Sequence, residues 1–404
     1  MQLWLINHKN CITDLLLFIL YSIDVIAYSI SGALNFLERR KKIYGPNFAS
    51  LGRIIVGEYE KCAEIIQSPQ QRGKYLGRAK LAPRKISSVF PLFLSDADAG
   101  GDDRHAILHK HFWETLVPPS MNILDDEAFQ SYLNELVTTI HEKNAGTSVK
   151  MTAKELKPMV EVMVVKYVFH AILGQALSSE EVEYANTLFN GVLPFSSYVL
   201  GATRPISGLI TCFDCKRSDL VSKMTEVVLN SPALQKYTPS EATANLSKED
   251  YAEMILSVIG IAGCLGSTNL CLQILTAIPD EYSINLEDKM EVTLAVLEAA
   301  RLKSPVNNIN VILKNELTLM IREKEYKFPK GTVVAASIGL SSVDASQFQN
   351  PHKYDPKREK LMTSCLNFNH VGFSPVGAGT RQCPGRNIAV KMASDLLIAL
   401  RSDV

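Results

Sequence analysis

The sequence predicts a mainly α-helical protein with a small β-rich region. Helical periodicity dominates the middle of the 404-residue chain, and a long apolar run from Tyr251 to Ile278 contains no proline and stops at Pro279. Short strand-like segments lie at residues 310–313 and 332–337, the second after a Pro-Lys-Gly turn. Because 47% of the residues are hydrophobic, the chain can bury a large core and is not a disordered protein.

The composition excludes several function classes. Lysine plus arginine and aspartate plus glutamate both number 42, so no strongly basic face for nucleic acid is indicated. The eight cysteines are scattered singly, which is typical of a reducing, intracellular compartment. Cys212 and Cys215 form a lone CxxC pair, and zinc would need two further ligands.

The N-terminal segment is apolar from Ile12 to Leu37 and is followed by a basic cluster at residues 39–42. Asp14 and Asp24 interrupt it, and a carboxylate in the middle of a membrane is costly. We therefore favour a helix packed on the fold, with a helix lying on a membrane surface as the alternative. The expected division is an apolar segment, residues 1–37, followed by one large domain, residues 38–404.

The central apolar run is expected to be a long buried helix. Ser247, with an acid three residues later, is a typical N-cap. Gly263 and Gly266 lie in the middle, where each costs about 1 kcal/mol relative to alanine. They indicate either close approach to a large flat ligand or tight helix–helix packing. A second helix is expected at about residues 286–302, and a final helix begins near Cys383.

The strongest local signal is the glycine-framed cysteine at residues 377–385. A cysteine at the start of a helix can be stabilised as a thiolate by backbone N–H groups. Gly377, Gly379 and Gly385 would let the backbone lie close against a macrocycle, and a thiolate is a known proximal haem ligand. Arg381 lies two residues before Cys383, within reach of a haem propionate. A purely structural loop is the alternative interpretation.

A second signal is the pair Glu298 and Arg301, which share one face of a helix at i,i+3 spacing. The residues before them are apolar, so the pair is expected to be buried, and a buried pair needs further partners. Arg358, in the segment Pro351–Arg358, is the natural third member.

These three signals together resemble the cytochrome P450 superfamily, whose signatures are E-x-x-R, P-x-x-[FY]-x-P-x-R and G-x-R-x-C-x-G in this order. The resemblance implies the mainly helical P450 prism, haem b as the cofactor and Cys383 as the axial iron ligand. It also implies that Glu298, Arg301 and Arg358 form an ion triad that braces the haem-binding loop. One departure is Val376, where the family usually has an aromatic residue.

The central helix departs further from oxygen-activating members of that superfamily. Leu265 and Gly266 stand where an acid and an alcohol usually relay protons, and Ser267 and Thr268 are shifted around the helix by about 100° and 200°. This region and residues 286–301 resemble the allene oxide synthase and hydroperoxide lyase (CYP74-like) clan. In that alignment Gly263 replaces an asparagine that lies over the haem, which implies an altered product. The candidate catalytic residues are therefore Gly263, Leu265, Gly266, Ser267 and Thr268.

His105 and His109 lie on a segment that, by the same resemblance, contacts haem propionates. A solvated helix is the main alternative, and zinc at this i,i+4 pair is a weaker one.

The expected activity is therefore rearrangement of a fatty-acid hydroperoxide without external O2 or reductant. One alternative is a monooxygenase that uses O2 and NADPH–P450 reductase, and another is an inactive haem-binding relic. The expected substrate is a lipophilic small molecule, because the central helix offers the pocket no charged group. The short connection from Pro279 to Leu286 and the chain end at Val404 favour a shortened product that lacks some central and C-terminal elements.

Overall fold

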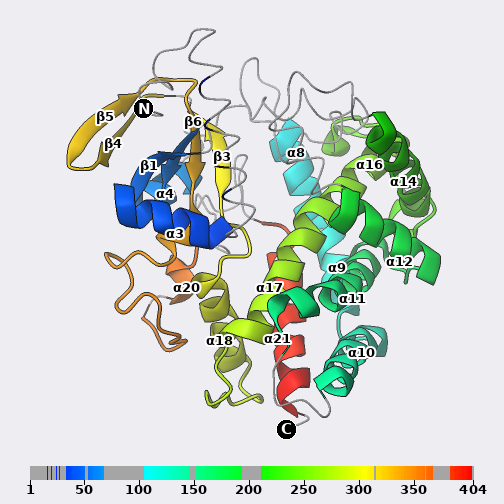
Figure 1. Cartoon of the computed structure of the whole chain (residues 1–404). Coiled ribbons are helices and arrows are strands. Elements are labelled where there is room, and N and C mark those ends of the chain that lie inside the picture. The colour runs from blue at the N-terminus through cyan, green and yellow to red at the C-terminus, as the bar shows by residue number, and fades with distance from the viewer. Residues whose placement is uncertain are drawn as a thin grey trace.

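The computed structural model describes Leu16, Leu20, Asp24, Ala27 and residues 33–50, 53–67, 104–144, 151–192, 211–313, 315–359, 361–366 and 383–402. Within these residues a β-rich part lies beside a larger helical part, and the predicted mainly helical class is confirmed (Figure 1).

The β-rich part contains a four-stranded sheet of order β1-β2-β6-β3. Strands β2 and β6 pair in parallel, and the other neighbours are antiparallel, so the N-terminal hairpin is joined to chain nearly 280 residues later. Gly331 adopts φ 88° in the turn before β6, and its N–H donates to the carbonyl of Leu313 at 2.8 Å. The strands predicted at residues 310–313 and 332–337 are therefore confirmed as β3 and β6. The four strands are β1 (Asn47–Ser50), β2 (Arg53–Val56), β3 (Ile309–Ile312) and β6 (Val333–Ala336).

A separate hairpin, β4 (Leu317–Ile321) with β5 (Lys324–Phe328), was not predicted. Its first strand alternates between buried and exposed residues, as a half-buried strand should. The turn, however, is formed by Arg322 and Glu323, which adopt φ 51° and 62°. Glycine and asparagine usually occupy such positions, so the local sequence lacks the ordinary hairpin signal.

Helices lie next to the sheet and make up the whole of the helical part, and several of them begin at side-chain caps. Thr152 and Ser178 each form a capping box with the glutamate three residues later. Next to the sheet lie α3 (Ala33–Tyr44), α4 (Tyr59–Gln67), α19 (Ile338–Ser341) and α20 (Leu361–Ser364). The helical part contains α8 (Arg104–His111), η2 (Phe112–Leu116), α9 (Val117–Ile123), α10 (Glu127–Asn144), α11 (Ala153–Leu173), α12 (Ser179–Asn186), η3 (Thr187–Val192), α14 (Thr211–Leu229), α15 (Pro232–Gln235), η5 (Glu241–Thr243), α16 (Lys248–Ser257), η6 (Val258–Cys264), α17 (Leu265–Ala277), α18 (Lys289–Leu302) and α21 (Arg386–Ser402).

The predicted central helix is present as α16, the π-helical segment η6 and α17 in succession. Ser247 is its N-cap and accepts the N–H of Asp250 at 3.0 Å. It ends as expected, because Ile278 is extended immediately before Pro279. Among the described residues, Glu241–Ala277 is the one stretch long and apolar enough to cross a membrane, yet 59% of its apolar window is buried inside the protein. It therefore serves as a core helix here.

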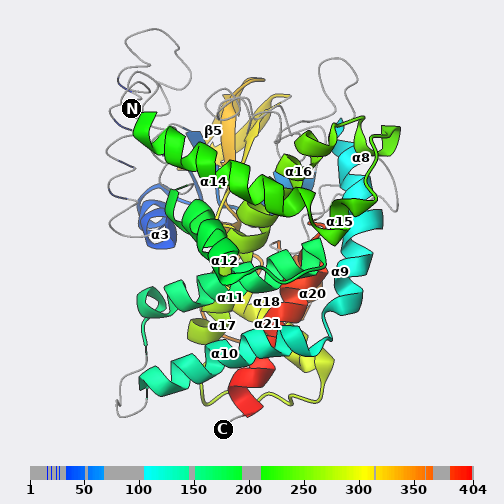
Figure 2. The ribbon, with the colours of Figure 1, turned by 90° about the vertical axis from the view of Figure 1, so that its right-hand side faces the viewer.

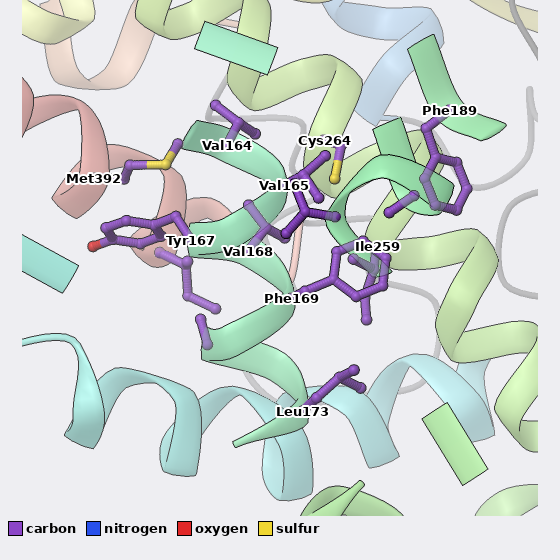
Figure 3. Packing of buried hydrophobic residues seen from close by; sticks show 14 of the residues in the cluster. Val164, Val165, Tyr167, Val168, Phe169, Leu173, Phe189, Ile259, Cys264 and Met392 are labelled. Carbon is purple, nitrogen blue, oxygen red and sulfur yellow. The ribbon is translucent and has the colours of Figure 1, made fainter. Parts of the chain in front are cut away.

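The largest core forms where α11 crosses η6 and α17, with α10, α12 and α14 stacked around it (Figures 2 and 3). Phe169 and Phe189 pack there with ring centroids 6.1 Å apart. The contact requires Gly260, since a Cβ atom at this position would lie 1.8 Å from the Phe189 ring. Helix packing thus fixes how the central helix is rotated about its axis.

Within the apolar N-terminal segment, Asp24 is 2% exposed. Its carboxylate accepts hydrogen bonds from Arg40 of α3 at 2.7 Å and from the Ser50 hydroxyl of β1 at 2.8 Å. These contacts favour the packed interpretation over a membrane-surface helix at this position. Most of residues 1–37 lie outside the described residues, and the division at residue 37 remains a prediction.

Candidate functional site

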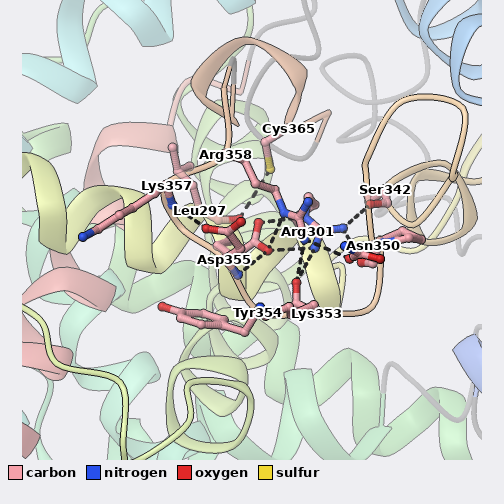
Figure 4. Close-up of polar contacts among 12 residues, drawn as sticks. Leu297, Arg301, Ser342, Asn350, Lys353, Tyr354, Asp355, Lys357, Arg358 and Cys365 are labelled. Carbon is pink, nitrogen blue, oxygen red and sulfur yellow. Dashed lines mark hydrogen bonds and ion pairs between the residues drawn. The ribbon is translucent and has the colours of Figure 1, made fainter.

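The structure brings Glu298, Arg301 and Arg358 together. Figure 4 shows the two arginines beside the loop residues that they bind. Glu298 and Arg301 are both 0% exposed on α18, and their side chains form a bidentate pair with N–O distances of 2.7 and 2.8 Å. Arg358 donates from Nε to the same carboxylate at 3.0 Å, and the backbone N–H of Asp355 adds a fourth hydrogen bond, also at 3.0 Å. One buried carboxylate therefore holds two guanidinium groups and a loop.

The two arginines bind the chain that follows β6. Arg301 Nη1 donates to two carbonyl groups at 2.7 Å, and its guanidinium lies 4.9 Å from the centroid of the Phe348 ring. Arg358 donates to three further carbonyl groups. Since these carbonyl groups belong to irregular backbone, the ion cluster acts as the scaffold that a helix or sheet would otherwise provide. The carbonyl groups are those of Ser342, Gln349, Asn350, Pro351 and Lys353.

Helices α17 and α21 lie side by side and run in the same direction (Figure 1). At the C-terminal end of α21, Arg401 donates to the carbonyl groups of Pro279 and Asp280, directly after α17, at 2.9 Å each. Cys383 comes just before α21. It therefore lies toward the end of the pair where α17 begins with Leu265 and Gly266.

Cys383 has partial exposure, in contrast to the buried thiols of Cys62, Cys264, Cys271 and Cys365. Burial raises the pKa of the Cys383 thiol, while N–H groups of Gly385 and Arg386, together with the Arg386 charge, act in the opposite direction. The N–H groups at the start of α21 thus bind the sulfur as expected, but they do not by themselves outweigh burial. A metal cation at the sulfur would supply the missing stabilisation of the thiolate.

One side of the central helix faces open space. Ala262 and Asn269 are exposed, and a Cβ atom added to Gly266 would meet nothing within 4 Å. These residues are one turn apart, so they form a strip along one face. We call Ala262, Gly266 and Asn269 the open strip. The open strip lies where η6 meets the N-terminal end of α17, and Cys383 lies toward this same end.

The other predicted residues of this helix do not share that strip. A Cβ atom at Gly263 would lie 2.9 Å from Val168 of α11, so this glycine permits close helix packing, and its expected place over the haem stays a prediction. Ser267 and Thr268 are 6% and 2% exposed. Thr268 shares its face with Cys264, which packs in the core with α11, so the catalytic role expected for these hydroxyls is not supported.

The remaining predicted residues are described only in part. Gly377, Gly379 and Arg381 lie outside the described residues, as does the side chain of His105. His109 is 8% exposed, and its ring stacks on Trp113 at a centroid distance of 6.4 Å. No cluster of three metal-ligating side chains occurs among the described residues, so the zinc alternative gains no support. Gly385 faces open space at its Cβ position.

These residues fit a haem group. Cys383 offers a soft sulfur ligand whose thiolate needs a cation, and the open strip offers a flat helix face without bulky side chains.

Two contacts near this site are not predicted by the sequence. The Asn269 amide donates to the carbonyl of Pro305 at 3.0 Å, and the loop carbonyl groups are held by the ion cluster. Neither leaves a local signal, because the partners are distant in sequence.

A family model described as Cytochrome P450 matches residues 272–400, which include the ion pair of α18 and Cys383. Among curated relatives, ent-cassadiene hydroxylase from Oryza sativa subsp. japonica is 32% identical over 111 residues, or 27% of this chain and 20% of that protein. The mitochondrial cholesterol side-chain cleavage enzyme from Mus musculus is 39% identical over 88 residues, or 21% of this chain and 15% of that enzyme. The matched part thus spans a fifth or less of these relatives.

Solved structures share the fold over almost the whole chain. Cytochrome P450 CYP109B1 from Bacillus subtilis aligns with a TM-score of 0.60 and 16% identity, covering 93% of this chain and 92% of that chain. CYP109E1 from Bacillus megaterium, in complex with corticosterone, aligns with a TM-score of 0.57 and 14% identity, covering 90% and 89%. The chain thus shares the fold of these cytochromes P450, and residues 272–400 match the family model, for which haem is the implied cofactor.

Proposed function

We propose that this chain is a haem-thiolate enzyme that acts on a lipophilic substrate. Cys383 would supply the axial sulfur, with the N–H groups of Gly385 and Arg386 supporting its negative charge. The open strip of the central helix would provide a surface without bulky side chains beside the group. When bound, a thiolate-ligated haem supplies an iron centre that favours cleavage of O–O bonds.

We further propose that the substrate carries its own O–O bond, as a fatty-acid hydroperoxide does. The observation behind this proposal is the chemistry of the open strip and its neighbour Leu265, which provide no carboxylate or hydroxyl group. The hydroxyls of Ser267 and Thr268 are buried away from the strip. Activation of O2 requires protons at a defined place, whereas rearrangement of a hydroperoxide requires neither a reductase nor a proton relay.

A monooxygenase is the second candidate, because relatives that match the chain are named as hydroxylases and a monooxygenase. For this activity a reductase would deliver electrons, and ordered water or the Asn269 amide would have to replace the missing acid–alcohol pair. The names of the relatives apply to proteins of which only a small part aligns. The residues of the open strip therefore decide our order of preference.

The ligand assignment is tested by the absorbance spectrum of the reduced, CO-bound protein. Cys383→Ser should abolish the thiolate-type spectrum, whereas Cys365→Ser, a change at a fully buried thiol, should retain it. A Gly266→Leu variant should fold but bind haem poorly, because its side chain would fill the open strip. A thiolate spectrum that persists in Cys383→Ser would refute the assignment.

The reaction is tested by two parallel assays of the haem-loaded protein. A polyunsaturated fatty-acid hydroperoxide without reductant should be consumed faster than lipids supplied with O2, NADPH and reductase. A Leu265→Asp variant, which keeps Gly266 and the open strip unchanged, supplies an acid at the start of α17 and should increase the NADPH-dependent rate. NADPH-dependent hydroxylation without consumption of the hydroperoxide would favour the monooxygenase. No turnover in either assay would favour a haem-binding protein that has lost catalysis.

A further inference from the structure

A tyrosine–histidine pair joins α8 to α16. Tyr251, on α16, is 1% exposed, and its hydroxyl lies 2.7 Å from Nε2 of His111, the last residue of α8. The Tyr237 ring stacks on Tyr251 with centroids 4.2 Å apart and planes 12° apart. Tyr237 is partly exposed, so the stack connects the buried pair to the surface.

The hydrogen bonds indicate which atom carries the proton. Nδ1 of His111 lies 3.3 Å from the Thr115 hydroxyl, which can accept the ring N–H. Burial lowers the pKa of His111 and raises the pKa of Tyr251. A neutral imidazole and a protonated phenol result, and the phenol donates to Nε2. The negative charge of Glu114 acts in the opposite direction to burial on the pKa of His111, and that of Asp250 raises the pKa of Tyr237.

We propose that Tyr251 is a redox-active tyrosine whose phenolic proton is taken up by His111. One electron leaves Tyr251 through the Tyr237 stack, the phenolic O–H bond breaks, and the proton moves to Nε2. The products are a neutral phenoxyl radical and an imidazolium, which now donates the same hydrogen bond in reverse. A buried phenol without a base would instead form a radical cation, which is strongly unfavourable away from water.

The oxidant belongs to the class of lipid alkoxyl radicals, which form when the O–O bond of a hydroperoxide breaks homolytically. The radical gains the electron together with one proton from solvent and becomes an alcohol. A small-molecule reductant, such as ascorbate or a thiol, then returns one electron to Tyr251, and the imidazolium returns the proton. The pair would thus remove damaging radicals, and this role rests on the proposed function.

A second pair offers a matched control within the same protein. The Tyr132 hydroxyl lies 3.1 Å from Nδ1 of His170, but within the described part of the chain no tyrosine ring stacks on Tyr132. The ammonium group of Lys166 lies 6.0 Å from the Tyr132 ring centroid, where its charge opposes removal of an electron. Tyr132 should therefore be a weaker radical site than Tyr251.

The test oxidises the full-length protein with a photogenerated ruthenium(III) complex and follows the phenoxyl radical by transient absorbance and electron paramagnetic resonance. Tyr251→Phe should lose most of the signal, and Tyr132→Phe should keep it. His111→Gln should lower the yield of the phenoxyl radical severalfold and remove the solvent isotope effect on its formation. A hydrogen bond with a purely structural role would give no such isotope effect to remove. A signal that is unchanged in both Tyr251→Phe and His111→Gln, or lost in Tyr132→Phe, would overturn the assignment.

This measurement uses no hydroperoxide, so it stands even when the proposed reaction fails. If Tyr251→Phe does not fold, His111→Gln and its isotope effect decide the assignment. The protective role has its own test, in which the parent and Tyr251→Phe are incubated with a fatty-acid hydroperoxide and the loss of haem absorbance is followed. The variant should bleach severalfold faster than the parent, and equal bleaching would overturn the protective role.

Discussion

Removal of the Glu298 carboxylate should destabilise the protein far more than removal of an exposed glutamate with the same spacing. In Glu298→Ala, four hydrogen bonds are lost, from Arg301 Nε and Nη2, Arg358 Nε and the Asp355 N–H. Arg301 then remains as an uncompensated charge at 0% exposure. Breaking a buried pair in this way typically costs about 3–5 kcal/mol.

The chain contains a matched control pair. Lys61 and Glu64 also form an i,i+3 ion pair, with an N–O distance of 3.0 Å, but their side chains are 39% and 47% exposed. Glu64→Ala should cost about 0–1 kcal/mol, because water replaces the lost partner. The two pairs share the i,i+3 spacing and have similar N–O distances, while burial and the number of hydrogen bonds to the carboxylate differ.

The assay is denaturant unfolding followed by far-ultraviolet circular dichroism for the parent, both single variants and Glu298→Ala/Arg301→Ala. The double variant should be less destabilised than the sum of the two single variants, because the second change removes the unpaired charge. A Glu298→Ala midpoint that moves no further than that of Glu64→Ala would refute the reasoning, and so would strict additivity in the double variant.

Two further predictions concern packing and pH. Gly260→Ala should destabilise the protein by about 1–3 kcal/mol or more, because its Cβ would overlap the Phe189 ring, whereas Gly266→Ala should leave thermal unfolding of the haem-free protein unchanged or shift it upward. Equal shifts would contradict the assigned helix rotation. Burial lowers the pKa values of His111 and His170, so the unfolded chain binds protons that the folded protein does not. Stability should therefore be fully present above about pH 6.5 and decrease as the pH falls below it. Melting temperatures at about pH 7.5 and 5.5 should differ less in His111→Gln and His170→Gln than in the parent, and an unchanged difference would contradict the assignment.

Several features of the fold followed from the sequence because their causes are local. Pro279 lacks a backbone N–H and restricts the preceding residue, so the central helix had to end there. Ser247 is a typical N-cap, and the structure has the helix begin directly after it. The ion cluster was also predictable, since Glu298 and Arg301 are neighbours on one helix turn and their apolar surroundings demanded a further partner.

The hairpin β4–β5 was not predicted for the opposite reason. Arg322 and Glu323 adopt left-handed backbone conformations in a turn that normally selects glycine or asparagine. The Arg322 guanidinium lies 4.6 Å from the Tyr44 ring centroid and donates to the Ile43 carbonyl at 3.3 Å, so contacts with α3 hold the turn. These contacts join residues almost 280 positions apart, and no local pattern records them.

The sequence by itself determined which residues carry the proposed chemistry, namely Cys383 at the start of a helix and a central helix without an acid–alcohol pair. Only the tertiary structure decided which central glycine faces open space. Gly263 and Gly266 are equivalent locally, and the sequence is compatible with ligand approach and with tight packing at both positions. Val168 of α11 fills the space beside Gly263 and leaves Gly266 free. The physical reason is that helix formation depends on neighbouring residues, whereas helix rotation depends on packing against a helix a hundred residues away.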